Sequence, residues 1–475
     1  MKLNLLVIFS SSLWAKAFHS TSKISIRTTN LARNSAFVFR TSSVTSSVPT
    51  IKEERNVQNQ QVKEVLAGFV TALATLPTSI SYSLVVGIKP LLGVWNSGLM
   101  GLSSGLIGGA PGLIIGSAGV TALPMAKIFQ SLGQEYMFFS LIAASVIEML
   151  FGVLKLSKFA SVIQEPVVSG FLNALGLFIL SSQVKVFKAH GNWLPIDLML
   201  PNLSIASLSA FLIYFISKAF PKSPVPPSFI GIIVSSLVAN LFKLPIKSLA
   251  DFVGRQNFQG GLSSLPSLLP LPSHIQFNEN TVPILLSTAF GVAIVSIVET
   301  IIANRVSYQN FKQTRREHEN ISANEEVPND PKDFNYNDHD KTITALGVGN
   351  LIAGCFGGYG GCGLIPNTIL NNKNGGSTRI SSISYAISIT MVVLLFSQTL
   401  GLIPMAALSG LMFIVALNTI EWHEGYKLLK SSLLSVQSMM NLIGMLATTY
   451  ISWKIDMGLG VVVGVVLTQL IPVLR

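Results

Sequence analysis

Charged side chains are scarce in this sequence. Asp, Glu, Lys and Arg make up 11% of the 475 residues, whereas soluble domains carry about 25%. Hydrophobic residues make up 49%, and the mean hydropathy is +0.57. Because a single soluble core stops growing at roughly 250–300 residues, this apolar excess excludes a water-soluble globule and predicts a chain that is buried in lipid.

Cysteine and histidine are too few and too scattered to form a covalent framework or an active site. The two cysteines, Cys355 and Cys362, lie in apolar glycine-rich sequence with no histidine nearby. We interpret them as small packing residues and expect neither disulfides nor a metal site. No nucleophile–base set is visible, so we expect no catalytic residues and a chain that is not an enzyme. The six histidines stand apart in polar stretches: His19, His190, His274, His318, His339 and His423.

The net charge of +11 does not indicate a nucleic-acid partner. The Lys and Arg side chains stand between apolar stretches or near the N-terminus, as loop charges that set membrane topology do. No basic stretch alternates with aromatic residues along one face, which nucleic-acid binding would require. We therefore expect the partners to be the lipid bilayer and a small solute.

The N-terminus has the composition of a targeting segment. In residues 1–17, Lys2 supplies the positive end, residues 3–9 are a short apolar run, and residues 15–17 (Ala-Lys-Ala) form a cleavage signal. The apolar run is too short to span a bilayer, so this segment is predicted to be a signal peptide.

The next segment, residues 18–60, begins as a transit peptide does. Between Phe18 and Val48 there is no Asp or Glu, while Ser, Thr, Lys and Arg are frequent. A signal peptide joined to such a segment at Phe18 resembles the two-part plastid leader of algae with complex plastids. We expect an integral protein of a plastid membrane. The alternative is a signal peptide followed by a disordered tail, with the protein in the plasma membrane or another endomembrane.

Fourteen apolar stretches follow one another between residues 62 and 474. Spanning segments in lipid must satisfy their own backbone groups, so an all-α polytopic membrane protein is predicted. A Pro- and Ser-rich connector, residues 254–280, separates a first repeat, residues 62–253, from a second, residues 281–475. Each repeat has seven stretches, and an odd number obliges the second repeat to start from the opposite side, which is the condition for inverted repeats. Within the second repeat, residues 307–340 are predicted to be a flexible polar loop.

Glycine clusters occur at matching places in the two repeats. Residues 108–112 and 116–119 contain five glycines in the first repeat, and residues 357–363 contain five more in the second. Each cluster belongs to the third stretch of its repeat and leads into a short apolar piece. Two half-helices whose N-termini meet at mid-membrane would direct free N–H groups and positive dipole ends at one point, which suits an anion. The alternative is that these glycines only allow close helix packing.

A few polar residues within the apolar stretches are further candidates. Glu299, beside Thr300, lies deep in its stretch, where a carboxylate costs about 2.5–3.5 kcal/mol and is expected to face a cavity, a cation or a proton. A hydrogen bond to a neighbouring helix is the alternative. Glu148 lies near the end of its stretch, where a structural role is at least as reasonable. Thr78, next to Pro77, which is expected to kink the helix, and Tyr82 one turn further on are candidates for substrate contact or for packing.

Several motifs together resemble those of the sulfate permease (SulP) family of transporters, over residues 62–475. They lie at residues 66–68, 76–77, 86–93, 166–173, 349–354, 357–358, 372–376 and 403–410. The resemblance implies fourteen helices in two inverted seven-helix repeats, arranged as a core domain and a gate domain, in a homodimer. It also implies a substrate site between the third and tenth helices, flanked by the first and eighth.

The resemblance assigns residues to that site by motif position. The substrate-binding set is Gly116, Ser117, Ala118, Gly119, Val120, Gly363, Leu364 and Ile365, with Thr78 and Tyr82 alongside. Cyanobacterial bicarbonate transporters of this family use an acid of the eighth helix in a sodium site, and Glu299, with Thr300, matches that position.

The sequence departs from relatives at Thr78, where many have Glu, at Ala303, where some have a hydroxyl residue, and at Asn367, where some have Arg. A C-terminal STAS domain, usual in the family, has no counterpart before Arg475. These changes leave the coupling ion and the identity of the anion open.

The expected function is secondary active transport of a small inorganic oxyanion, sulfate or bicarbonate, by alternating access. Transport would be coupled to Na+ or H+, or would proceed by exchange, and no other cofactor is expected. A channel-like anion conductor and a nucleobase permease of similar architecture are the alternatives, and a membrane enzyme is a third class for which the chemistry is lacking.

Overall fold

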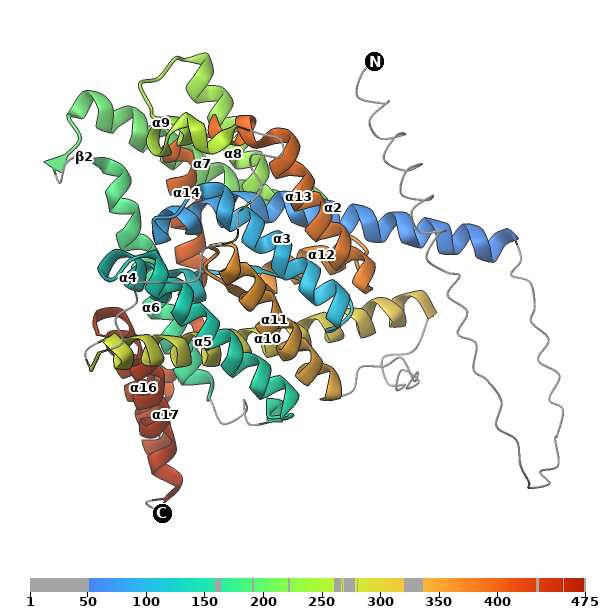
Figure 1. The fold of residues 1–475 in the computed structure, drawn as a ribbon, viewed down its shortest axis with the longest axis vertical. Helices are drawn as coiled ribbons and strands as arrows, with labels where there is room; N and C mark the ends of the chain where they lie inside the picture. The colour runs from blue at the N-terminus through green and yellow to red at the C-terminus, as the bar shows by residue number, and fades with distance from the viewer. Residues whose placement is uncertain are drawn as a thin grey trace. The chain divides into compact units, whose positions relative to one another are not determined.

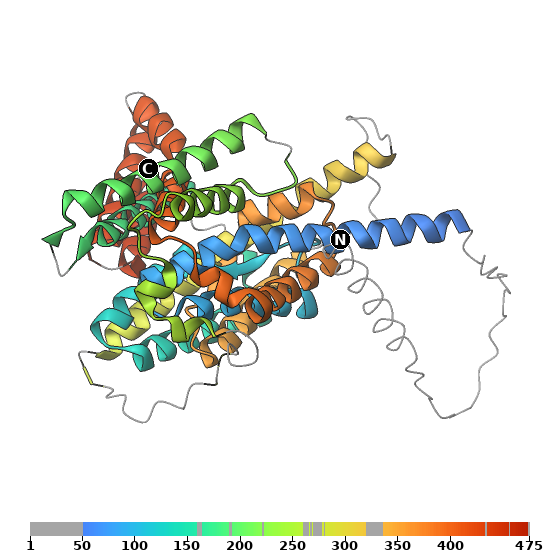
Figure 2. The same cartoon turned by 90° about the horizontal axis from the view of Figure 1, so that it is seen from above.

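The structure is a computed structural model, and it describes residues 51–158, 164–189, 192–220, 223–259, 266, 268, 278–279, 281–319, 336–432, 435–455 and 457–473. The chain forms two units, Met1–Lys52 and Glu53–Arg475, and the second contains all of the apolar stretches. The predicted signal peptide, residues 1–17, and most of the predicted transit segment, residues 18–60, lie outside the described residues. The end of that segment belongs to α2 (Ile51–Val86), which Figures 1 and 2 show as one continuous helix.

The first repeat is a series of helices interrupted by one short strand. Its elements are α2, α3 (Pro90–Ile107), β1 (Ile115–Ser117), α4 (Gly119–Ser131), α5 (Gln134–Val153), α6 (Glu165–Gln183), α7 (Ile196–Ala219) and α8 (Pro227–Leu241). A turn of 3-10 helix, η2 (Val184–Phe187), and a small hairpin of β2 (Lys188–Ala189) and β3 (Asn192–Trp193) join α6 to α7. The first repeat ends with α9 (Leu249–Val253), and η3 (Arg255–Phe258) lies at the start of the connector.

The second repeat has the same order of elements. It comprises α10 (Thr281–Glu319), α11 (Tyr336–Cys355), β4 (Gly361–Gly363), α12 (Ile365–Lys373), α13 (Arg379–Gly401), α14 (Met405–Thr419), α15 (Trp422–Ser432), α16 (Val436–Lys454) and α17 (Met457–Val473). In both repeats a short strand stands in the third segment, directly before a short helix. This arrangement agrees with the glycine clusters, because glycine-rich backbone is poor helix and forms extended structure readily.

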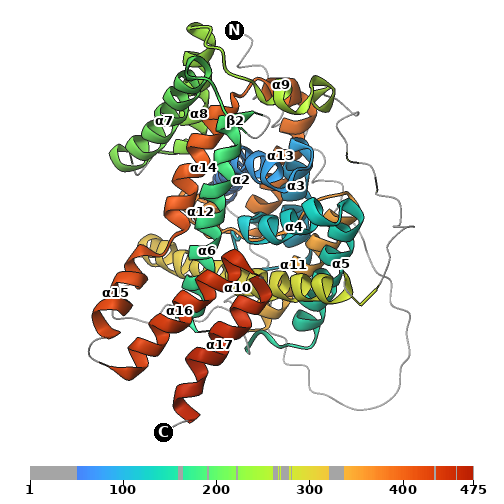
Figure 3. The same cartoon turned by 90° about the vertical axis from the view of Figure 1, so that its left-hand side faces the viewer.

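The helices of one repeat pack against those of the other in pairs that are related by exchange of the two repeats. Helix α5, the fourth segment of the first repeat, packs on α11, the second segment of the second repeat. Likewise α13, the fourth segment of the second repeat, packs on α3, the second segment of the first repeat. In the same way α6 packs on α16, and α14 on α7; Figure 3 shows α6, α16 and α17 side by side. Exchanging the repeats converts each pair into its counterpart. The all-helical fold with two related halves is therefore confirmed.

Glycines permit close approach at these crossings. A Cβ added at Gly101 of α3 would lie 2.6 Å from the Tyr385 ring of α13, and one added at Gly347 of α11 would lie 2.6 Å from Met149 of α5. Since both crossings occur through glycine at equivalent helices, close packing by small residues is part of the repeat.

A lipid-facing exterior is evident from the composition of the helices. Seven helices of the described residues are long and apolar enough to cross a membrane: Gln60–Val86, Gln134–Val153, Glu165–Phe187, Ile196–Ala219, Thr281–Gln309, Arg379–Gly401 and Met405–Ser431. Large apolar side chains stand exposed on them, including Leu150 (53%), Phe211 (60%) and Leu395 (63%). In water such surfaces would favour aggregation, so they indicate an integral multi-pass membrane protein. The count of fourteen spanning segments stays a prediction.

Two local predictions need correction. The polar stretch 307–340 is not simply a loop, because α10 continues through its first part to Glu319 and α11 begins within it at Tyr336. Residues 320–335 lie outside the described residues. The sequence analysis also missed α15, a short amphipathic helix whose exposed face carries Trp422 and Tyr426 while Leu428 is buried.

Candidate functional site

The two glycine-rich segments meet in a two-stranded antiparallel ribbon. Strand β1 pairs with β4 so that Ile115 lies opposite Gly363, Gly116 opposite Cys362 and Ser117 opposite Gly361. Every residue of both strands is buried. Unwound backbone of this kind is tolerated inside a membrane protein only where protein or a cavity surrounds it. The matching positions in the two repeats thus form one structure, as the half-helix hypothesis requires.

A helix starts at each end of the ribbon without a side-chain cap. Helix α4 begins at Gly119, after Ala118 in extended conformation, and α12 begins at Ile365, after Leu364. Neither Ala118 nor Leu364 provides a side-chain hydrogen bond to the helix that follows. The first N–H groups of a helix have no partner within it and carry the positive end of the dipole. Because the strands are antiparallel, the two helix starts approach the ribbon from opposite ends.

Helix α10 places two of the predicted residues against β4. The Cys362 thiol donates a hydrogen bond to Glu299 Oε2 over 2.8 Å, and the Gly363 N–H donates to Thr300 Oγ1 over 2.8 Å. Glu299 is half-buried, whereas Thr300 and Cys362 are fully buried. Cys362 is therefore more than the small packing residue that the sequence suggested, since its thiol contacts the predicted ion-coupling acid. Its position after four glycines gave no sign of this contact.

The two candidates on α2 have different surroundings. The Tyr82 ring lies against the start of α4, because a Cβ added at Gly119 would be 3.1 Å from the Tyr82 hydroxyl oxygen. Thr78 is half-buried and its hydroxyl donates to the Thr75 carbonyl of its own helix over 2.9 Å. Gly119, a predicted substrate-binding residue at the start of α4, thus has Tyr82 as a neighbour, and Thr78 has its hydrogen-bond donor occupied locally.

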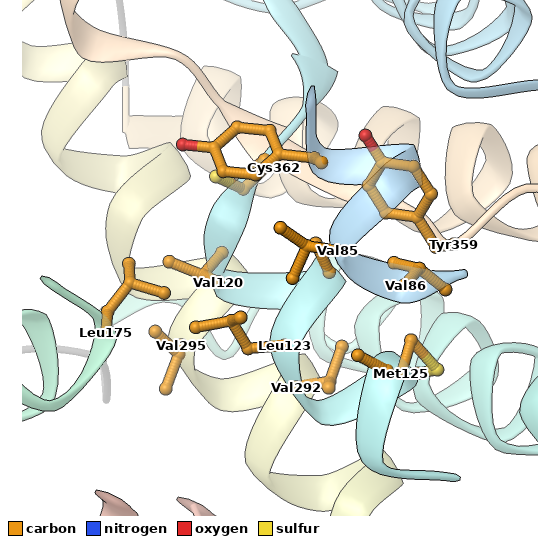
Figure 4. Close-up of a cluster of buried hydrophobic side chains, with 14 of the residues drawn as sticks. Val85, Val86, Val120, Leu123, Met125, Leu175, Val292, Val295, Tyr359 and Cys362 are labelled. Atoms are coloured by element: carbon orange, nitrogen blue, oxygen red, sulfur yellow. The ribbon is translucent and has the colours of Figure 1, made fainter. Parts of the chain in front are cut away.

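Apolar packing closes one side of the ribbon. Figure 4 shows Cys362 and Tyr359 at one side of a cluster that contains Val120, Leu123 and Val295. This cluster joins α4 to α10, so it fixes the start of α4 relative to the helix that carries Glu299. A site built on such packed elements is held more precisely than one built on loops.

Neither intramembrane acid has a basic partner in the described ranges. The ion pairs there are Arg255–Asp251 and Lys427–Glu424, both distant in sequence from Glu299 and Glu148. The described residues also contain no group of three or more His, Cys, Asp and Glu side chains that could hold a metal ion. The described surroundings of Glu299 therefore offer it a thiol hydrogen bond and no compensating cation.

Three residues around the ribbon had no role in the sequence analysis as site residues. Asn96 of α3 bonds to Gly360, Asn350 of α11 bonds to Gly361, and Glu148 of α5 accepts a hydrogen bond from Asn350. A signal existed in the sequence, because the pattern Gly-Val-x-Asn occurs at residues 93–96 and again at 347–350. This internal repeat was not recognised.

Comparison with known proteins decides the family. The sequence profile described as "Sulfate permease family" matches residues 62–441 of the chain. The chain belongs to the sulfate permease family. The resemblance drawn from the sequence motifs is thereby confirmed.

Individual members of the sulfate permease family agree with this assignment. The candidate sulfate transporter YbaR of Bacillus subtilis is 26% identical over 408 residues, covering 86% of this chain and 76% of YbaR. The bicarbonate transporter BicA of Picosynechococcus is 24% identical over 428 residues, covering 85% of this chain and 69% of BicA. The solved transmembrane domain of a cyanobacterial BicA has a TM-score of 0.63 at 21% identity, covering 87% of this chain and 98% of that domain, so the two share a fold.

The departures from other members of the sulfate permease family have local explanations. Ala303 is fully buried, and its methyl group would lie 2.9 Å from a Cβ added at Gly363, so the space beside β4 is filled by a small apolar residue. The Asn367 side chain donates to the Thr75 hydroxyl of α2 over 2.5 Å, and so connects α12 to α2.

Proposed function

We propose that this protein is a secondary active transporter of a small inorganic oxyanion, sulfate or bicarbonate, that works by alternating access. The observation that carries the proposal is the pair of uncapped helix starts, Gly119 of α4 and Ile365 of α12, at the two ends of one buried ribbon. Partial positive charge from two helix N-termini can hold an anion without a lysine or arginine. Such binding is weak enough to allow release, which a transporter needs.

We propose that the anion lies beside Gly116, Ser117, Ala118, Gly119 and Val120 on one side, with Gly363, Leu364 and Ile365 on the other. Tyr82 supports this position, because its hydroxyl adjoins the start of α4 and can donate to an anion. Glycine at position 119 allows an oxyanion to approach the first backbone N–H groups of α4 closely.

We propose Glu299 and Thr300 as the coupling site for Na+ or H+. Glu299 is half-buried in α10 and has no ion pair within the described ranges. An intramembrane acid persists where a cavity, a cation or a proton requires it. Cys362 and Gly363 of β4 bond to Glu299 and Thr300, and β4 leads into the start of α12. A cation or proton bound at Glu299 would therefore change the position of the helix start that binds the anion.

The substrate is tested by uptake into proteoliposomes made with the purified protein. Labelled sulfate, bicarbonate and molybdate are each offered with an inward Na+ gradient, an inward H+ gradient, or neither, and counterflow is measured with the same anions. We expect concentrative uptake of sulfate or bicarbonate with one of the gradients. Voltage-driven current without a coupling ion would indicate a channel, and uptake of uracil in preference to every anion would indicate a nucleobase permease.

Location and assembly are parts of the same proposal. The two-part leader, residues 1–17 and 18–60, leads us to propose a plastid membrane of an alga with complex plastids, with the plasma membrane or another endomembrane as the alternative. We also propose a homodimer, which is checked by the mass of the detergent-solubilised protein. A monomeric mass at all concentrations would remove the dimer from the proposal.

A further inference from the structure

The two asparagines beside the ribbon each bind both backbone groups of one glycine. Asn350 accepts a hydrogen bond from the Gly361 N–H (2.8 Å) and donates to the Gly361 carbonyl (3.2 Å). Asn96 accepts from the Gly360 N–H (3.1 Å) and donates to the Gly360 carbonyl (2.8 Å). Both side chains are buried, with exposures of 0% and 1%. A carboxamide carries one acceptor and one donor group, as a peptide unit does, so each asparagine replaces a neighbouring strand.

Each asparagine is held in turn by a second buried group. Asn350 Nδ2 also donates to Glu148 Oε2 (2.8 Å), and the other oxygen of Glu148 accepts from the Ser296 hydroxyl of α10. Asn96 Nδ2 also donates to the Ser117 hydroxyl of β1 (2.8 Å). The chain of contacts around Asn350 therefore joins α5, α10 and α11 to β4, and that around Asn96 joins α3 to β1 and to Gly360, the residue before β4.

The two asparagines are equivalent in the two repeats. Both stand in the pattern Gly-Val-x-Asn, at residues 93–96 of α3 and 347–350 of α11, and these helices are the second segments of their repeats. Asn96 binds Gly360, directly before β4, and Asn350 binds Gly361, its first residue. Cys362 and Gly363, which contact Glu299 and Thr300, follow directly. The backbone of Gly360 and Gly361 is thus fixed by hydrogen bonds directly before the proposed site.

We infer that Asn96 and Asn350 are the positioning residues of the anion and coupling sites, and that Glu148 acts through Asn350 to orient it. This inference rests on the proposed function. The asparagines touch neither the anion nor the coupling ion; they fix the strand whose thiol and N–H group reach α10.

The test changes Asn350 and Glu148, the two partners of one hydrogen bond, separately and together. Asn350→Asp keeps an acceptor for the Gly361 N–H, but it removes the donor to Gly361 and sets a second carboxylate beside Glu148. Adding Glu148→Gln returns one N–H donor between the two side chains. We expect Asn350→Asp to raise the KM for the anion more than tenfold, Glu148→Gln alone to raise it by a smaller factor, and the double variant to have a lower KM than Asn350→Asp. Asn96→Asp should also raise KM, and it carries the test if Asn350→Asp does not fold.

A second measurement does not depend on transport. In a Cys355→Ser background Cys362 is the only cysteine, and it is fully buried. The rate of its alkylation by N-ethylmaleimide should rise at least tenfold in Asn350→Asp and return toward the parental rate in the double variant. Asn202→Asp is the matched control, because Asn202 is also buried but bonds only within its own helix, to the Leu198 carbonyl; it should leave the alkylation rate unchanged.

The outcomes separate this inference from the proposed function. If the parental protein takes up no anion, the proposed function fails, while the alkylation rates still decide whether the asparagines fix the strand. If the parental protein transports an anion but Asn350→Asp keeps its KM and its alkylation rate, the inference is wrong. A double variant no better than Asn350→Asp would remove Glu148 from it.

Discussion

Enlarging Gly363 by one methyl group should disable the proposed site without unfolding the protein. A Cβ added at Gly363 would lie 2.8 Å from Thr300 Cα and 2.9 Å from Ala303 Cβ. Ordinary carbon contacts begin near 3.5 Å, and the nearer atom is backbone, which cannot rotate away. Strand β4 must therefore move from α10 or remain strained.

The size of the effect follows from that clash. Overpacking a well-packed site by one carbon costs about 1–3 kcal/mol. A shift of β4 would also lengthen the 2.8 Å hydrogen bond from the Gly363 N–H to Thr300, whose loss costs about 1 kcal/mol. The two costs together are about 2–4 kcal/mol. Since about 1.4 kcal/mol corresponds to a factor of ten, we expect Gly363→Ala to lower initial anion uptake by roughly 30- to 700-fold, in both gradient-driven and exchange modes.

The assay is labelled-anion uptake by proteoliposomes that contain equal amounts of folded protein. Gly425→Ala is the control, because a Cβ there would meet only the end of the Met445 side chain, at an ordinary 3.7 Å. Adding Ala303→Gly to Gly363→Ala removes one of the two clashes and should restore part of the uptake. Wild-type uptake by Gly363→Ala would refute the reasoning, since it would mean that the tight contact between β4 and α10 has no bearing on transport.

Three further predictions concern other parts of the chain. Glu299→Gln should abolish gradient-driven accumulation while exchange survives in part, and unchanged accumulation would reduce Glu299 to a structural role. Glu64 is buried and accepts hydrogen bonds from two N–H groups and one hydroxyl at residues 377–378, at 2.7–3.1 Å. Glu64→Ala should therefore lower the free energy of unfolding by about 1.5–3 kcal/mol and lower the thermal unfolding temperature in detergent; an unchanged temperature would contradict this. A fluorescent protein fused to residues 1–60 should reach the plastid of an alga with complex plastids and should stop outside it with Phe18→Ala, and secretion of the unmodified fusion to the cell surface would refute the plastid proposal.

The sequence by itself determined the solvent, the class of fold and the family. A lipid environment follows from 11% charged residues with 49% hydrophobic ones, because such a composition cannot form a soluble core of this length. The glycine clusters at 108–119 and 357–363 predicted unwound third segments, and β1 and β4 occupy those places. These features are local in sequence, so a single pass along the chain finds them.

The contacts between the repeats were decided only by the tertiary structure. The sequence predicted that the two glycine-rich segments meet, but it did not give the register that pairs Gly116 with Cys362. It also did not show that Asn96 and Asn350 bind the successive glycines Gly360 and Gly361. Such contacts depend on how α3 and α11 cross α13 and α5, which is set by side-chain packing over whole helix faces. The glycine patterns predicted where the backbone leaves the helical conformation. The side chains that bind this unwound backbone come from other helices, because buried N–H and carbonyl groups bond to the partners that the packing brings within reach.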